Sequence, residues 1–294
     1  MEQQDGRWGQ QGDGDTRPRS ASGASASGAD RITERWTIQE GQSRVIDIDA
    51  VHALKVGIVG GSVDIVGHDE ATARVEVHRV EGPDLAVSLE QGRLQVAHMR
   101  MSWDDLWSSI RSLAGGRARV ELSILVPRGV DLTLGQVTAS GLISGLQARA
   151  SASTVSGALQ VESHRGPLDV NTVSGDVEAS DVAGRVNVHS ISGEVAISGA
   201  LEEAGVDTVS GDVLLDVHGS PRAISVNAVS ADVAVRLDAD QGARVSTRTV
   251  SGRGTVGGRA LPKRGGNESL EGRQPFGLSA NTVSGAVTVV RRDV

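Results

Sequence analysis

The chain has 294 residues, contains no cysteine and carries a formal net charge of −8. The missing cysteines exclude disulfides and cysteine-ligated metal centres, and the acidic balance argues against nucleic-acid binding. No apolar run reaches the roughly 18 residues that a membrane-spanning helix needs. Aromatic residues make up only 2% of the chain, against 38 glycines, which is typical of a thin, regular β-structure.

Residues 1–30 consist mainly of glycine, serine, alanine, glutamine and aspartate, with almost no large apolar side chain. Such a segment cannot bury enough apolar surface to offset the entropy of folding, so we predict that 1–30 is disordered and that 31–294 is the folded domain. The residues after Met1 also lack the basic and apolar regions of a secretory signal. We therefore expect a cytoplasmic protein, with the cell surface, reached by non-classical export, as the alternative.

Short strands are predicted between residues 44 and 96. Apolar and polar residues alternate there in runs such as Arg44–Ile48, Leu54–Val59 and Arg74–His78. A period of two places alternate side chains on opposite faces of a strand. This part therefore belongs to the same β-structure as the residues that follow it.

One segment, 103–114, departs from the strand pattern. Its large apolar residues, Trp103, Leu106, Trp107, Ile110 and Leu113, recur at the spacing of one helical face. We predict a short amphipathic helix that packs on the β-structure. The alternative is a membrane or partner anchor, which the acidic residues on its polar side disfavour.

A repeated phrase, Thr-Val-Ser-Gly or a close variant, dominates the second half of the chain. It occupies Thr154–Gly157, Thr172–Gly175, Ser190–Gly193, Thr208–Gly211, Ala228–Ala231, Thr249–Gly252 and Thr282–Gly285. The spacings are 18, 18, 18, 20 and 21 residues, with a final jump of 33. A period near 20 indicates one supersecondary unit per repeat, and such a unit is stable only when stacked on its neighbours.

The flanks of each phrase predict two short strands joined by a corner. Apolar residues lie three and five positions before the central Val or Ile and four and six positions after it, so each flank has the strand period but the parity shifts at the phrase. Stacked repeats would place equal positions about 4.8 Å apart. We predict an all-β fold, a single β-solenoid of stacked 18–21-residue repeats, with the polar segment 259–275 as a projecting loop.

Two rows of polar residues could carry chemistry. The first comprises Asp176, Glu194, Asp212 and Asp232, three residues after each phrase centre. It could form weak cation sites or paired catalytic carboxylates, but an acidic corner that keeps the solenoid edge soluble is the favoured interpretation. The second row consists of the Thr and Ser hydroxyls of the phrases, which could bind ice or carbohydrate but more often satisfy backbone groups. No catalytic residue or cofactor is predicted.

These phrases, together with Trp36-Thr37-Ile38 and the stretch from Val59 to His68, resemble a bacterial family of β-strand-repeat domains of unknown function labelled "putative adhesin". The resemblance covers about residues 36–294. It implies a single β-helix-like solenoid, and it defines no catalytic or ligand residue. The sequence departs from the family pattern at Ala231 and at Arg253-Gly254.

We expect a non-catalytic structural or interaction protein, an adhesin-type solenoid that presents a repetitive surface to a protein or glycan. One alternative is an intracellular accessory of an envelope-stress or regulatory system, which the absence of a signal segment favours. The other is a polysaccharide-active β-helix enzyme, which needs convergent carboxylates where the sequence offers a single row. The oligomeric state is left open.

Overall fold

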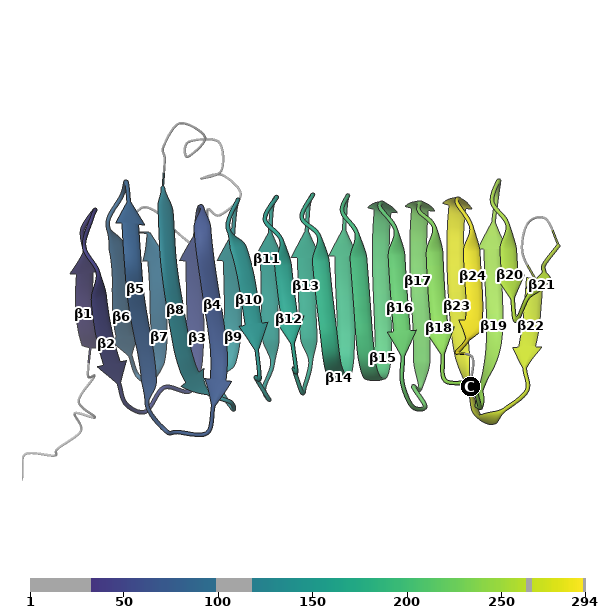
Figure 1. Ribbon diagram of the computed structural model, residues 1–294, viewed down its shortest axis with the longest axis horizontal. Helices are drawn as coiled ribbons and strands as arrows, with labels where there is room; N and C mark the ends of the chain where they lie inside the picture. The colour runs from purple at the N-terminus through teal and green to yellow at the C-terminus, as the bar shows by residue number, and fades with distance from the viewer. Residues whose placement is uncertain (1–32, 99–117, 263–265, 293–294) are drawn as a thin grey trace, which may run out of the picture. The chain divides into compact units, whose positions relative to one another are not determined.

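The computed structural model describes residues 33–98, 118–262 and 266–292. The described residues belong to one compact unit, and they contain strands and no α-helix (Figure 1). The predicted disordered segment 1–30 and the predicted helix 103–114 lie outside the described residues. The described residues therefore include no helix that could span a membrane.

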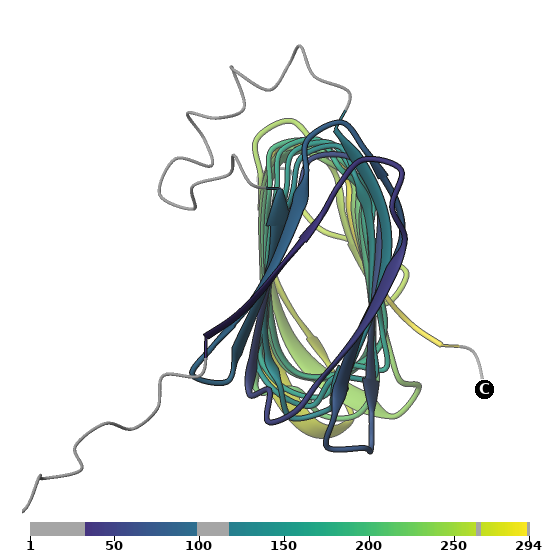
Figure 2. The same ribbon diagram turned by 90° about the vertical axis from the view of Figure 1, so that its left-hand side faces the viewer.

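The strands form one continuous sheet that winds into a flattened coil with two broad faces (Figure 2). The first face comprises, in spatial order, β1 (Thr33–Ile38), β6 (Leu85–Glu90), β7 (Arg93–His98), β3 (Ala53–Ile58), β9 (Asp131–Gln136), β11 (Ala150–Thr154), β13 (Leu168–Thr172), the second half of β14 (Val177–Ser190), the second half of β15 (Val195–Ser210), β17 (Ala223–Ser230), β23 (Arg273–Ser284), β19 (Gln241–Thr249) and β22 (Gly266–Leu270). The predicted all-β, solenoid-like architecture is therefore confirmed.

The second face is built from the other strand of each coil. It comprises β2 (Arg44–Ile48), β5 (Ala73–Glu81), β8 (Arg119–Pro127), β4 (Gly61–His68), β10 (Ser140–Ser144), β12 (Leu159–Glu162), the first halves of β14 and β15, β16 (Val213–Val217), β18 (Val233–Leu237), β24 (Val287–Arg291), β20 (Gly254–Val256) and β21 (Arg259–Ala260). Each repeat thus contributes one strand to each face, and the Thr-Val-Ser-Gly phrase forms the corner between them.

The order of the coils in space differs from their order in the chain at both ends. At the N-terminal end the coil β3–β4 lies between β7–β8 and β9–β10. At the C-terminal end the last coil, β23–β24, lies between β17–β18 and β19–β20. The jump of 33 residues between the last two phrases therefore covers the path out to the end of the solenoid and back.

The described residues of the segment 259–275 lie mostly in strands of the sheet, where a projecting loop was predicted. The segment contains β21 and β22, which pair antiparallel with β20 and β19, and it reaches the start of β23. At the other end β1 and β2 also pair antiparallel with their neighbours. Because an open solenoid end exposes unpaired backbone groups, these short antiparallel strands cap the parallel coils.

The core consists of rows of small aliphatic residues that repeat from coil to coil. Val170, Val188 and Val206 are fully buried neighbours in one row, and Val177 and Val195 are buried neighbours in another. These are the inward positions that the period of two predicts. The thin interior explains why the chain needs so few aromatic residues, since two closely spaced faces leave little room for large side chains.

Candidate functional site

In the phrases that begin with threonine, the threonine hydroxyl holds the corner between the two faces. Thr172 points inward, and its Oγ1 accepts a hydrogen bond from the Gly175 backbone N–H at 3.0 Å while donating to the Gly175 carbonyl at 2.9 Å. Thr154 makes the same pair of bonds with Gly157. The threonine row is therefore buried and structural.

At Gly211 the glycine of the phrase is required by close packing between coils. A Cβ atom built on Gly211 would lie 2.2 Å from the carbonyl oxygen of Gly193, and Gly211 has a φ of +106°. Only glycine accepts both the contact and the left-handed conformation without strain. The backbones of adjacent corners can therefore approach each other closely at this position.

The inward threonine directs the next residue, the central Val or Ile, out of the solenoid. These residues stack from coil to coil in the order Val137, Val155, Val173, Ile191, Val209, Val229, Val283 and Val250, which we call the valine ridge. From Ile191 onward their exposure ranges from 47% at Val283 to 74% at Val250. From Ile191 to Val250 the ridge is therefore a row of exposed aliphatic side chains, and its first three residues are half-buried.

The serine row beside the ridge satisfies the backbone. Ser174 Oγ donates to the Val155 carbonyl at 3.0 Å, and Ser192 Oγ donates to the Val173 carbonyl at 3.2 Å. Each serine thus ties its corner to the ridge residue of the preceding coil. The hydroxyl donors are used inside the protein, as the structural interpretation predicts.

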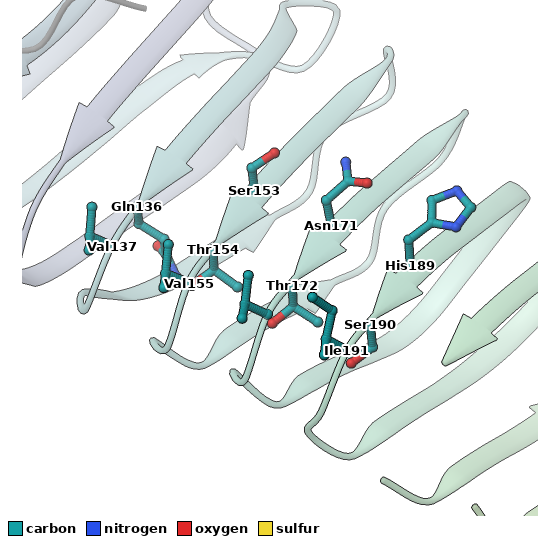
Figure 3. A pocket seen from close by; sticks show the side chains of 11 residues that line it. Gln136, Val137, Ser153, Thr154, Val155, Asn171, Thr172, His189, Ser190 and Ile191 are labelled. Carbon is teal, nitrogen blue, oxygen red and sulfur yellow. The ribbon is translucent and has the colours of Figure 1, made fainter. Parts of the chain in front are cut away.

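A shallow groove runs between the ridge and a row of polar side chains on the first face. In Figure 3, Val137, Val155 and Ile191 border one side, and Ser153, Asn171 and His189 border the other.

Further along the solenoid the polar row becomes a chain of hydrogen bonds. His189 Nδ1 lies 3.1 Å from Asp207 Oδ2, and Asn227 Nδ2 donates to Asp207 Oδ1 at 2.8 Å. Asn281 in turn donates to Asn227 Oδ1 at 2.9 Å. The polar row therefore continues beside the ridge, beyond the groove, as a hydrogen-bonded chain.

The acidic row lies on the other side of the ridge, and all four of its residues are exposed. Asp176 Oδ1 accepts the backbone N–H of Glu194 at 2.9 Å, and Asp212 Oδ1 accepts that of Asp232 at 3.1 Å. Asp232 Oδ1 likewise accepts the N–H of Ala286 at 2.7 Å. One carboxylate oxygen of each of these three aspartates thus links its corner to the next by a hydrogen bond, which gives the row a structural role. Within the described residues no cluster of His, Asp and Glu is arranged to hold a metal ion.

Two histidines are buried in the solenoid. Burial lowers the pKa of His98 to about 4, and neither of its ring nitrogens has a partner among the described residues. Burial also lowers the pKa of His164. Both side chains are therefore neutral at pH 7, and neither lies on the ridge.

Sequence reasoning located the ridge corners from Thr154 onward, but it did not identify the ridge itself or the corner at Val137. The parity shift at each phrase showed that the chain bends there, without showing whether Thr or Val points outward. The available signal was the Val or Ile that recurs at the centre of each phrase. A corner exposed to solvent does not need a β-branched aliphatic residue, so its repetition indicates an exposed apolar row.

A search of curated proteins finds no match to this chain. Among solved structures, a "putative adhesin" from Parabacteroides distasonis is similar, with 13% identity, 85% of this chain and 98% of that chain covered, and a TM-score of 0.42. A "putative lipid binding protein" from the same organism has 13% identity, coverage of 86% and 98%, and a TM-score of 0.36. A "putative cell adhesion protein" from Clostridium sporogenes has 10% identity, coverage of 85% and 99%, and a TM-score of 0.30.

The family model of Toastrack DUF4097 matches residues 47–289, which include almost all coils of the solenoid and every corner of the ridge. The match agrees with the resemblance to bacterial β-strand-repeat domains that the phrases indicate. The chain belongs to the Toastrack DUF4097 family.

Proposed function

We propose that this protein is a non-catalytic interaction protein that presents the valine ridge and its flanking polar rows to a protein or glycan. One observation carries the proposal: five consecutive ridge residues, from Ile191 to Val250, are about half exposed or more. Exposed aliphatic side chains in a contiguous row are costly in water and typical of a surface that a partner covers.

The polar groups near the ridge support binding rather than catalysis. The carboxylates of the acidic row lie side by side along one edge instead of converging on a common point, and three of them accept backbone hydrogen bonds. Glycoside hydrolysis needs two carboxyl groups that flank the scissile bond, one to protonate the leaving oxygen and one to act as base or nucleophile. A one-dimensional row suits repeated, equivalent contacts along an elongated partner.

The ridge can be tested with a pair of matched variants. We expect the double substitution Val209→Ser and Val229→Ser to leave the melting temperature unchanged, because both side chains are 48% exposed. It should abolish binding to the peptide or glycan that the wild-type protein captures from immobilised arrays. The control is Leu214→Ser, which removes a 46% exposed aliphatic side chain from the second face. Equal binding by the ridge variant, loss of binding only in Leu214→Ser, or turnover of the captured ligand would contradict the proposal.

A further inference from the structure

We infer that the occupant of the ridge is a basic amphipathic α-helix of a protein partner, which lies along the solenoid with its apolar face on the ridge and its cationic flank on the acidic row. This inference rests on the proposed function and names the partner's chemistry. It follows from the charges beside the ridge, from the backbone of the corners and from the spacing of the coils.

The acidic row carries charge that the described part of the protein leaves uncompensated. Many carboxylates elsewhere on the solenoid are paired with arginine: Asp169 with Arg149 at 3.0 Å, Asp181 with Arg165 at 2.7 Å, and Glu203 with Arg185 at 3.0 Å. None of the four acidic-row side chains has such an ion pair within the described residues. The surface therefore combines an exposed aliphatic row with a parallel row of unpaired negative charge, and a complementary partner carries apolar and cationic groups in parallel rows.

The backbone of the corners favours a helix over an extended peptide. At each corner the N–H groups of the phrase donate to carbonyls of the neighbouring coil, as Ser174 does to Val155 at 2.8 Å and Ser192 to Val173 at 2.7 Å. A partner that crosses the coils finds no free ladder of backbone groups, so β-strand addition is unavailable along the ridge. An α-helix satisfies its own backbone hydrogen bonds and needs only side-chain contacts.

The dimensions of the two surfaces agree. Ridge and acidic-row residues of one coil are three residues apart, so their Cα atoms lie within about 11 Å. An α-helix is about 10–12 Å across with its side chains, so a helix resting on the ridge reaches the carboxylates. Four coils, from Val173–Asp176 to Val229–Asp232, span about 14 Å at the usual strand spacing. Three helical turns of about 5.4 Å cover that length, and cations one turn apart on the helix lie at nearly the spacing of the carboxylates, which is about 4.7 Å.

Charge also sets the register of the bound helix. The end coil that bears Val250 carries Arg248 and Arg253 in the flanking positions, and both arginines are exposed. A cationic helix is repelled there, even though Val250 is the most exposed ridge residue. The inferred site is therefore the four-coil stretch from Val173 to Val229.

The test uses two synthetic helical peptides of about four turns that share a leucine face at i, i+3, i+4 and i+7 and carry either lysine or glutamate on the flanks. Binding to the full-length chain is measured by fluorescence anisotropy. We expect the lysine peptide to bind and the glutamate peptide to fail. Raising the salt from about 0.05 M to about 0.5 M should weaken binding at least about tenfold, because these exposed charges are screened.

Three protein variants locate the site. The double variant Asp212→Asn and Asp232→Asn keeps the oxygens that accept backbone hydrogen bonds while removing two charges, and it should weaken lysine-peptide binding by about tenfold. Val250→Ser tests the register, and Glu121→Gln removes one exposed charge at a distant place on β8. Both should bind within about twofold of wild type.

Each alternative outcome overturns the inference. Equal binding of the two peptides, or an unchanged affinity in the aspartate variant, would show that charge does not select the partner. A ridge-dependent dimer in sedimentation equilibrium would identify a second copy as the occupant. If neither peptide binds while the ridge variant still loses its captured ligand on the arrays, the inferred helix is wrong and the proposed function stands.

Discussion

Replacing Val188 with aspartate should be among the most damaging single changes in the solenoid. Val188 is fully buried in β14, between Val170 and Val206 of the adjacent coils. Losing a buried valine side chain forfeits about 1.5–3 kcal/mol of burial. The new carboxyl group has no polar neighbour in that row, and an unpartnered buried polar group costs a further 1–3 kcal/mol or so. Together these give an expected loss of about 2.5–6 kcal/mol, against a total stability of about 5–15 kcal/mol for a typical domain.

The comparison variant is Asp212→Asn, which retains the oxygen that accepts the Asp232 N–H and should change stability by less than about 0.5 kcal/mol. Urea denaturation followed by circular dichroism gives both midpoints. If Val188→Asp does not fold, Val188→Ala provides a graded test, with an expected loss of about 2 kcal/mol. A larger loss for Asp212→Asn than for either Val188 variant would refute the assignment of inward and outward rows.

Gly211→Ala should cost about 3 kcal/mol, because the added Cβ would lie 2.2 Å from a backbone oxygen at a φ of +106°. Gly277→Ala is the control, since nothing lies within 4 Å of its added Cβ, and equal melting temperatures for the two variants would contradict the packing argument. His98 should make the protein acid-sensitive, because its folded pKa of about 4 lies below the ordinary value of 6.5. Between pH 6.5 and pH 4 the unfolded chain binds more protons than the folded one, so the folded state loses stability as the pH is lowered. The stability of His98→Leu relative to wild type should therefore rise by about 3 kcal/mol between pH 7 and pH 4, and a constant difference would show that His98 is not buried as a neutral ring.

The repeat architecture was predictable because it depends on local signals. The phrase at residues 154–157 and its later copies recur at nearly constant spacing, and the apolar residues on either side keep the strand period. Both properties follow from each coil making the same contacts with its neighbours. The buried positions of Val188 and Val206 could be assigned from this pattern alone, because a period of two leaves only one face for the core.

The tertiary structure decided the order of the coils and the composition of the exposed edge. Nothing in the local sequence distinguishes a coil that stacks on its chain neighbour from one that inserts between two earlier coils, as β23–β24 does, because every coil presents the same backbone ladder. The direction of the corner residues depends on the hydrogen bonds between Thr172 and Gly175, which form only when the chain bends. The valine ridge therefore emerges from stacked corners, since a single corner exposes one valine and only the aligned coils turn it into a continuous surface beside the acidic row.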